Sequence, residues 1–411
     1  MRLHPFCALH PRPDLAAEVA SPPYDVVDAA EARALVLGRP DSFLRVVRSE
    51  VGLPQDTDPY APEVYAAAAE RLRAMIADEV LVRDPSPAIW VYRLDWGLQT
   101  QIGFVGCVEV DDYLSGRVKR HEHTRRDKED DRTRHIDTVG AHTGPVFLTC
   151  RAQPSLSALQ SRLTADAPTL EVTARSVRHR LWRVADPELL GVLERAMAQL
   201  DAFYIADGHH RAASAARARD LRRAAHPTAP ADAGFERFLA VVFPADQLRI
   251  LPYNRVVADL NGLSEDAFLE RIDGPFEVSP PGSPAAPVSR HEMALYLGGK
   301  WRMLRARRHL IDEDDPIARL DVAILQDHLL APVLGISDPR SDKRIDFVGG
   351  IRGTDELSRR VDAQGGGCAF SMTATSIEEL LAVADAGLVM PPKSTWFEPK
   401  LASGLLVHPL D

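Results

Sequence analysis

The stretch Tyr204-Ile205-Ala206-Asp207-Gly208-His209-His210-Arg211 leads from an apolar strand through a tight turn into a helix. We expect the strand over residues 202–206 and an alanine- and arginine-rich helix over 209–225. Gly208 allows the backbone to bend and a ligand to approach without meeting a Cβ atom. The first N–H groups of the helix and the positive end of its dipole face this turn. The stretch therefore predicts an anion-binding site.

The side chains of this turn favour phosphate as the anion. His209, His210 and Arg211 add donors at the helix start, and arginine can hold a phosphate through two hydrogen bonds. Asp207, at the end of the strand, is placed to ligate Mg²⁺ bound to such phosphates. The alternative is an ordinary capped helix, with Asp207 as N-cap and the histidines on the surface. Two histidines and an arginine at one helix start favour the phosphate site.

A second group of candidate residues lies in the charged stretch 116–132. Glu122 is surrounded there by cations, so we expect it to be ionised and to act as a general base or a metal ligand. Four neighbouring side chains could neutralise phosphate charge: Lys119, His121, Arg125 and Arg126. The alternative is a solvated helix face with an Arg125–Glu129 ion pair.

Two other motifs have a simpler interpretation. His121-Glu122-His123 is not followed by a third ligand at a fixed spacing, which argues against a zinc site. Lys393-Ser394-Thr395 resembles the end of a P-loop but follows Pro391-Pro392 instead of a glycine loop, so we reject a Walker A motif. These three residues either line a pocket or belong to a packed C-terminal segment.

The pattern along the chain predicts a mixed α/β fold without internal repeats. We expect three regions: 1–112 as an N-terminal α/β region, 113–260 as the core with the phosphate site, and 261–411 as a C-terminal α/β region. Expected strands are 42–47, 88–95, 101–110, 180–184 and 238–243, with a hairpin of 293–297 and 301–305 turning at Gly298-Gly299. Expected helices are 28–34 with a capping box, 62–78, 318–330 and 376–386.

Composition limits the class of protein. The chain has 411 residues, 45% of them hydrophobic, and a formal net charge of −10. This acidity argues against nucleic-acid binding through bulk electrostatics. No apolar run approaches the roughly 18 residues of a membrane helix, and the N-terminus lacks the features of a signal peptide. The four cysteines are far apart in the sequence, as expected of small buried side chains in a reducing compartment. We therefore expect a soluble, cytoplasmic protein with no nucleic-acid or membrane partner.

Five motifs together resemble the DUF1015 family, from the first residues to the last. They are Ser21-Pro22-Pro23-Tyr24-Asp25-Val26, Lys119-Arg120-His121-Glu122-His123-Thr124-Arg125, the stretch from Tyr204 to Ala215, Asp346-Phe347-Val348-Gly349-Gly350 and the segment from Met390 to Lys400. The Asp-Gly-His-His-Arg box further resembles the second motif of the ParB/sulfiredoxin superfamily, most closely its free-serine kinases. This resemblance implies a ParB/sulfiredoxin-like nucleotide-binding core with additional N- and C-terminal α/β regions.

The resemblance also implies an activity, the transfer of a phosphoryl group from ADP or ATP to free L-serine with Mg²⁺ as cofactor. Asp207 would hold Mg²⁺, and Gly208, His209, His210 and Arg211 would hold the phosphates. Glu122 would be the base, with Asp207 and His209 completing the catalytic set. Arg125, Arg126 or Lys119 would clamp the substrate carboxylate.

Two other classes of function stay open for this chain. One is that of a nucleotide-sensing regulator related to CTP-dependent DNA clamps, but the chain shows no helix-turn-helix and no basic reading surface. The other is a different phosphotransferase or hydrolase on the same scaffold. The sulfiredoxin reaction is disfavoured, because it requires a cysteine where this chain has His209.

Overall fold

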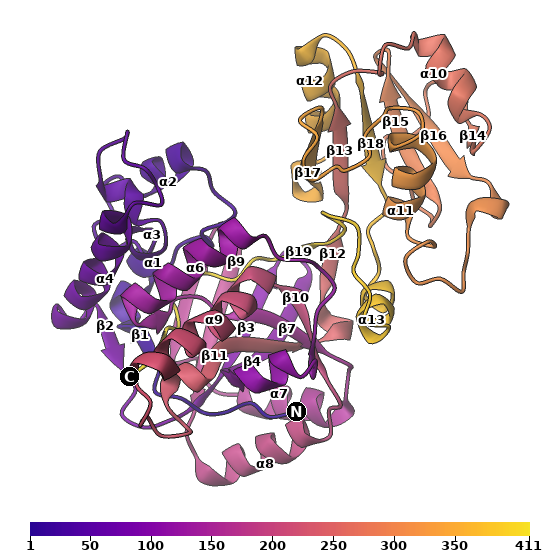
Figure 1. The fold of residues 1–411 in the computed structure, drawn as a ribbon. Helices are drawn as coiled ribbons and strands as arrows, with labels where there is room; N and C mark the ends of the chain where they lie inside the picture. The colour runs from indigo at the N-terminus through magenta and orange to yellow at the C-terminus, as the bar shows by residue number, and fades with distance from the viewer. The chain divides into compact units, whose positions relative to one another are not determined.

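Two separate sheets organise residues 1–411 in the computed structural model, which has a mixed α/β fold as predicted (Figure 1). One compact unit comprises Met1–Leu248 and Pro399–Asp411, and the other comprises Arg249–Glu398. This division differs from the expected regions 1–112, 113–260 and 261–411. Two adjacent strands from before residue 112 lie between strands from after it in one sheet, so most of the first two regions belongs to a single unit.

An eight-stranded sheet forms the centre of the first unit. In spatial order its strands are β5 (Val118–Lys119), β10 (Phe203–Asp207), β7 (Val146–Cys150), β11 (Arg237–Pro244), β4 (Gln99–Glu109), β3 (Ile89–Trp96), β9 (Val177–Val184) and β8 (Leu170–Ala174). β10 runs parallel to β5, with Phe203 opposite Val118, and antiparallel to β7. The ends of β5 and β10 that lead into their following loops therefore lie at the same edge of the sheet.

Helices cover this sheet. They are α5 (Val110–Leu114), α6 (Arg126–Val139), α7 (Pro154–Leu163), α8 (Pro187–Ala198) and α9 (His209–Ala225). Figure 1 shows α6 and α9 side by side, and they pack directly on each other. The small residues Ala212, Ala215 and Ala216 bring α9 close to the buried core. Arg217 of α9 pairs with Glu129 and Asp130 of α6, at 3.4 and 2.5 Å.

The N-terminal segment forms a second layer of the first unit with its own apolar cluster. Its elements are β1 (Leu9–Pro11), α1 (Ala16–Val19), α2 (Ala29–Leu35), α3 (Leu44–Val47), α4 (Pro62–Ala77) and β2 (Leu81–Arg83). The predicted capping box is present, because Asp28 and Glu31 exchange side-chain to backbone hydrogen bonds. The end of the chain returns here as β20 (His408–Pro409), which pairs with β6 (Ala141–His142).

The predicted strand over residues 42–47 is wrong, since Leu44–Val47 forms the short helix α3. The alternation in the sequence does not correspond to one buried and one exposed face, because Phe43, Leu44, Val46 and Val47 are all buried. The Ser21 hydroxyl also accepts the backbone N–H of Leu44 at 3.2 Å, a side-chain partner at the helix start. Tertiary packing thus overrides the β-propensity of the valines.

The second unit contains a six-stranded antiparallel sheet. In spatial order its strands are β14 (Phe276–Val278), β16 (Lys300–Ala306), β15 (Glu292–Leu297), β18 (Cys368–Met372), β13 (Tyr253–Val257) and β17 (Ile345–Gly349). A separate pair joins β12 (Arg249–Leu251) to β19 (Trp396–Glu398). The helices are α10 (Glu265–Ile272), α11 (Asp321–Leu325), α12 (Asp355–Gln364) and α13 (Ile377–Asp385). The predicted hairpin of β15 and β16, turning at Gly298-Gly299, is confirmed.

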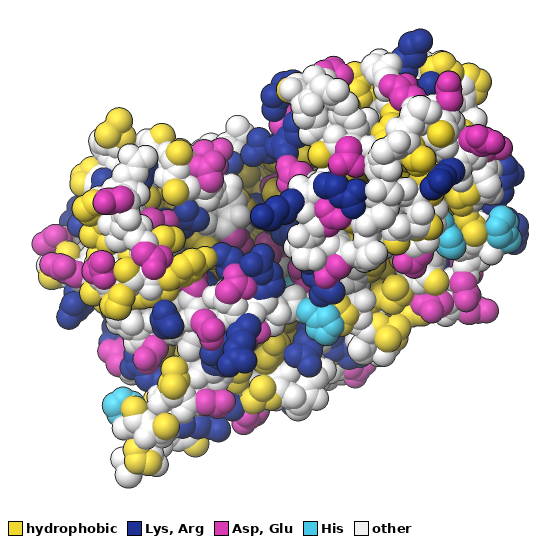
Figure 2. Space-filling view, turned by 45° about the horizontal axis from the view of Figure 1, so that its top comes forward, with side chains coloured by type: hydrophobic (Ala, Val, Ile, Leu, Met, Phe, Trp, Pro, Cys, Tyr) yellow, Lys and Arg dark blue, Asp and Glu magenta, His cyan; other side chains and the backbone are white.

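The surface and the cysteines agree with the composition. Acidic and basic side chains alternate over the face seen in Figure 2. All four cysteines are free thiols, and Cys107, Cys150 and Cys368 are buried, as expected. No helix combines the length and apolar character required to cross a membrane.

Candidate functional site

The predicted strand-turn-helix is confirmed at Asp207-Gly208. β10 ends at Asp207 and α9 begins at His209, with Gly208 as the N-cap in a left-handed conformation at φ 96°. A residue with a side chain would be strained there. The alternative in which Asp207 caps the helix is not observed. Because Gly208 has no capping side chain, the first N–H groups of α9 meet no side-chain acceptor from the N-cap residue.

Asp207 is held between two cations. Its carboxylate lies 2.9 Å from Lys400 Nζ and 4.0 Å from Arg211 Nη2, and its side chain is 27% exposed. Burial acts to raise the pKa of Asp207, but the charges of Lys400 and Arg211 outweigh it and lower the pKa below its usual range. The Arg211 Nη1 in turn donates to the Pro145 carbonyl. Asp207 therefore fixes an arginine at the first turn of α9.

The predicted Mg²⁺ ligand Asp207 does not form a metal site with its neighbours. No group of three or more His, Cys, Asp or Glu side chains lies close enough together to hold a metal ion. The two cations already compensate the charge of the Asp207 carboxylate. Magnesium completes its near-octahedral shell with waters and substrate phosphates, and it needs only one or two protein carboxylates. The role of Asp207 as a ligand of phosphate-bound Mg²⁺ therefore stays a prediction.

Parallel pairing of β5 with β10 brings Glu122 to the same turn. Glu122 follows β5 by three residues, and its Oε2 lies 3.8 Å from Nδ1 of His209. The His121 and His209 rings meet edge to face at 4.5 Å between centroids. Glu122 and His209 are 87 positions apart and are separate candidates in the sequence, and the structure brings them together.

His209 is a neutral ring in this arrangement. It is 5% exposed, and burial followed by the influence of His121 lowers its pKa well below the ordinary value. Its Nε2 accepts the backbone N–H of His121 at 3.4 Å, so the proton is on Nδ1, facing Glu122. His210 is similarly engaged, since its Nε2 accepts the backbone N–H of Arg125 at 3.0 Å. The neutral His209 ring therefore presents no cation to the turn in this conformation.

The other predicted contacts are dispersed. Lys119 Nζ lies 5.6 Å from the centroid of the Tyr204 ring. The Arg125 guanidinium pairs with Asp127 at 2.9 Å, and the expected pair with Glu129 does not form. Arg126, at the first position of α6, is exposed to solvent. The Arg125 and Arg126 side chains are both exposed, and their role as substrate contacts stays a prediction.

Lys393, Ser394 and Thr395, for which the sequence leaves two alternatives open, belong to a packed segment. Ser394 is buried and donates to the Pro391 carbonyl at 2.6 Å. Lys393 Nζ lies 5.5 Å from the centroid of the Tyr253 ring. This arrangement favours the packed segment over a pocket wall.

Two small cavities beside Arg211 involve residues for which the sequence predicts no role. One is lined by the Asp207–Arg211 pair, Lys400 and residues 144–145. The other is lined by Arg211, Tyr24, Arg132 and Thr143, and the two cavities share Pro23, Gly144, Arg211 and Ser403. Two of the family-like motifs, 21–26 and 390–400, contribute Tyr24 and Lys400. These motifs are the signal in the sequence that could have identified both residues.

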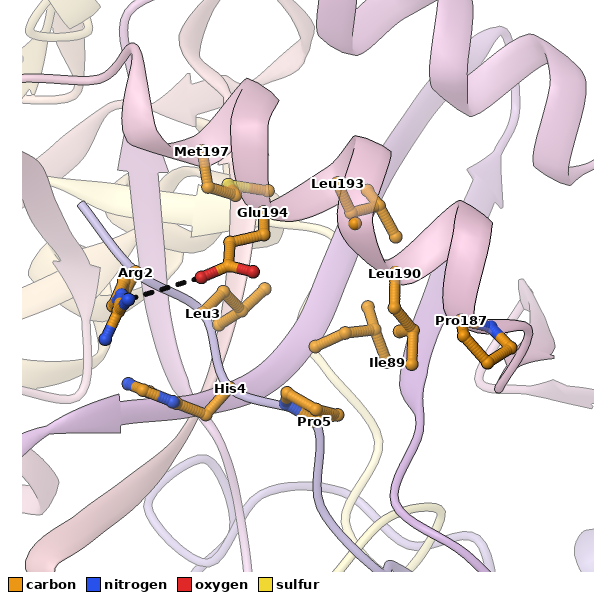
Figure 3. Close-up of a pocket in the computed structure, with 11 residues that line it drawn as sticks. Arg2, Leu3, His4, Pro5, Ile89, Pro187, Leu190, Leu193, Glu194 and Met197 are labelled. Carbon is orange, nitrogen blue, oxygen red and sulfur yellow. Dashed lines mark ion pairs between the residues drawn. The ribbon is translucent and has the colours of Figure 1, made fainter.

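A larger cavity, of about 420 Å³, lies away from these residues (Figure 3). Apolar side chains of the N-terminal segment and α8 line much of it, including Leu3, Leu190 and Met197, and an Arg2–Glu194 ion pair at 3.3 Å spans one side. It contains none of the predicted catalytic or phosphate-binding residues. This cavity is therefore separate from the predicted site.

Most of the chain matches the model of one protein family. A family model described as "Protein of unknown function (DUF1015)" matches residues 3–323. The chain belongs to the DUF1015 family. The matched residues include the Glu122 loop and the whole Asp207–Arg211 turn. A search of curated proteins finds no significant match.

Several solved structures are similar to this DUF1015 chain at low identity and with low TM-scores. A conserved hypothetical protein from Pyrococcus furiosus is 14% identical, with a TM-score of 0.36 over 74% of this chain and 95% of the other. A free serine kinase in complex with AMP is 16% identical, with a TM-score of 0.34 over 73% and 92%. SbnI with a C-terminal truncation from Staphylococcus aureus is 12% identical, with a TM-score of 0.39 over 74% and 87%. None of these similarities assigns an activity to this chain.

Proposed function

We propose that this protein is a nucleotide-dependent phosphotransferase that transfers a phosphoryl group from ADP or ATP to the hydroxyl of free L-serine. The observation that carries the proposal is the position of Glu122, 3.8 Å from His209 at the start of α9. A carboxylate base and an anion-binding helix start are then parts of one site. The resemblance of the Asp-Gly-His-His-Arg box to that of free-serine kinases supports the choice of reaction.

The phosphates would bind at the start of α9. The backbone N–H groups after Gly208 and the positive end of the helix dipole supply the part of this site that is formed by neighbouring residues of the chain. Arg211 and Lys400 supply fixed positive charge, and Asp207 orients both. His209 is a positioning residue in this scheme, because its Nδ1–H faces the Glu122 carboxylate.

Glu122 would accept the proton of the serine hydroxyl as the reaction begins. The serine oxygen forms a bond to the terminal phosphorus of the nucleotide, and the bond from that phosphorus to the nucleotide's bridging oxygen breaks. Phosphoryl transfer passes through a loose transition state, so positioned cations contribute most of the stabilisation. The products are O-phospho-L-serine and AMP or ADP.

A product assay tests the proposal. The purified chain is incubated with L-serine, a magnesium salt and either ADP or ATP, and products are followed by ³¹P NMR. We expect phosphoserine in a one-to-one ratio with the shortened nucleotide. Nucleotide binding without phosphoserine from either donor would contradict the proposal and indicate a nucleotide-sensing protein.

Gly208→Ala should weaken nucleotide binding beyond its effect on stability. The left-handed backbone costs a residue with a side chain about 1–2 kcal/mol, and the new Cβ would lie 3.1 Å from Cζ of Arg211. Gly116→Ala is the matched control, because Gly116 has φ 79° and a Cβ atom added there would meet no neighbour within 4 Å. We expect similar losses in urea-unfolding free energy for both variants, with ADP affinity reduced only in Gly208→Ala by calorimetry. Equal ADP affinity in the two variants would contradict a phosphate site at this turn.

Asp207→Asn is expected to lower phosphoserine formation at least 100-fold, on the order of the loss seen when one transition-state contact is removed. The change leaves Lys400 and Arg211 without their shared counter-charge. Asp137→Asn is the control, because it breaks a 2.7 Å pair with Arg222 on the same helix α9. Initial rates and circular dichroism are measured for both. Wild-type rates in Asp207→Asn would exclude Asp207 from the site.

A further inference from the structure

A small cavity next to the proposed phosphate site contains two arginines. Arg211 and Arg132 both line it, together with Tyr24 and Thr143. The aliphatic residues that line it are Val47, Ile136, Val146 and Leu239. No acidic side chain lines this cavity. Such a lining, which combines cationic, hydroxyl and aliphatic groups, suits a small organic acid.

Arg132 is fixed from two sides. Its Nε and Nη2 donate to Asp131 Oδ2 at 2.9 and 2.8 Å, and Asp131 Oδ1 accepts the Tyr65 hydroxyl at 2.8 Å. The Arg132 guanidinium also lies over the Tyr24 ring, with Cζ 4.3 Å from the ring centroid. The segment carrying Tyr24 is itself held, because Arg48 donates to the Tyr24 carbonyl at 3.1 Å. A cation positioned in advance binds an anion with less loss of side-chain freedom.

Arg211 retains unused hydrogen-bonding capacity. Its Nε is buried without a hydrogen-bond partner, although Nη1 donates to Pro145 and Nη2 lies 4.0 Å from Asp207. A buried donor without a partner is costly, so this nitrogen is suited to an incoming oxygen ligand. The same guanidinium thus borders both the Asp207 turn and the Tyr24 cavity.

The size of the cavity distinguishes a small group from a nucleotide. Its volume is about 40 Å³. A single water needs roughly 10–15 Å³ on this measure, so a few heavy atoms fit and a nucleotide base does not. The two histidines in the wall do not add charge near neutral pH, because burial lowers the pKa of His135 to about 4 and of His142 to about 3. The cations of the cavity are therefore the two arginines.

We propose that the cavity lined by Tyr24, Arg132, Thr143 and Arg211 binds the carboxylate of a small amino or hydroxy acid, the acceptor substrate of the neighbouring site. The assignment of this acid as acceptor rests on the proposed phosphotransferase function. In this proposal Arg132 and Arg211 take the place of the exposed Arg125 and Arg126 as the carboxylate clamp. Arg211 then contacts both the donor phosphates and the acceptor.

The test measures binding of three probes by calorimetry, using the full chain. They are L-serine, ethanolamine, which lacks only the carboxylate of serine, and inorganic phosphate, each with and without ADP. We expect serine to bind about 10- to 100-fold more tightly than ethanolamine, the effect of hydrogen bonds to a charged group. Arg132→Gln should remove this preference and leave ADP affinity unchanged. Arg134→Gln, an exposed arginine two positions along α6, is the control.

Each outcome separates the cavity from the nucleotide site. ADP binding together with equal affinity for serine and ethanolamine would overturn the carboxylate site and leave the phosphotransferase proposal standing. Phosphate binding that depends on Arg132, without serine binding, would also overturn it in favour of a phosphate subsite. Serine binding that depends on Arg132, without ADP binding, would support the cavity and contradict the proposed function. If Arg132→Gln does not fold, Tyr24→Phe serves instead, with a smaller expected loss of serine affinity from the missing hydroxyl.

Discussion

Glu122→Gln is expected to lower the rate of phosphoserine formation about 10²- to 10⁴-fold, the range of general-base catalysis. The amide keeps the size of the side chain but cannot accept the hydroxyl proton. Nucleotide affinity should stay within about twofold, because the phosphates would bind to α9 and Arg211 and not to Glu122. Single-turnover rates with saturating serine and nucleotide measure the effect on the chemical step.

Glu171→Gln is a closely matched control for this experiment. Glu171 lies on β8, and its side chain is 39% exposed, compared with 40% for Glu122. It pairs only with Arg178 at 2.6 Å on the sheet surface, so its loss should cost little. A wild-type rate in Glu122→Gln would remove the base from the mechanism. A large loss in both variants would indicate a general effect on the fold.

Acidification below about pH 6.5 is expected to destabilise the protein strongly. Burial lowers the pKa of several histidines, among them His121, His135, His179 and His408 to about 4 and His142 to about 3. The unfolded chain has histidine pKa values near 6.5. Between pH 6.5 and 4 the unfolded state therefore binds more protons than the folded state, and folding free energy is lost as pH falls.

The expected effect is large because the histidines act in the same direction. Each contributes at most about 1.4 kcal/mol per pH unit in this window, and total stabilities are on the order of 5–15 kcal/mol. Asp321 acts in the opposite direction, since burial raises its pKa to about 6. Urea-unfolding midpoints at pH 7.5, 6.5 and 5.5 measure the balance. A midpoint that does not fall over this range would show that the buried histidines are not neutral in the folded state.

Two single variants separate buried from exposed histidines. His179 is buried, with its Nδ1 2.7 Å from the Tyr92 hydroxyl, and His179→Gln should reduce the pH dependence by up to one proton. His226, at the exposed end of α9, should have no such effect when changed to Gln. If the unfolding free energy depends on pH equally in the two variants, burial of histidines is not the main cause of the pH dependence.

The error at residues 42–47 shows the limit of local patterns. The residue pattern predicts a strand there, but Phe43 and the valines are buried on all sides and the segment is helical. By contrast, the sequence predicts the helix over 209–225 with its observed bounds. Its alanines, its glycine N-cap and the preceding apolar strand are neighbours in the sequence. These local features all favour the same helix, and tertiary packing does not oppose them.

The sequence by itself determined the strand, the turn at Asp207-Gly208 and the helix that follows, because these depend on neighbours a few positions apart. The tertiary structure decided which distant groups share the turn. Lys400 reaches Asp207 across 193 positions, and Glu122 reaches His209 only because β5 pairs parallel with β10. The tertiary structure also decided that Tyr24, Arg132 and Arg211 line one cavity. Strand pairing and helix packing are set by the burial of the whole core, and the spacing of residues within a short stretch of sequence does not predict them.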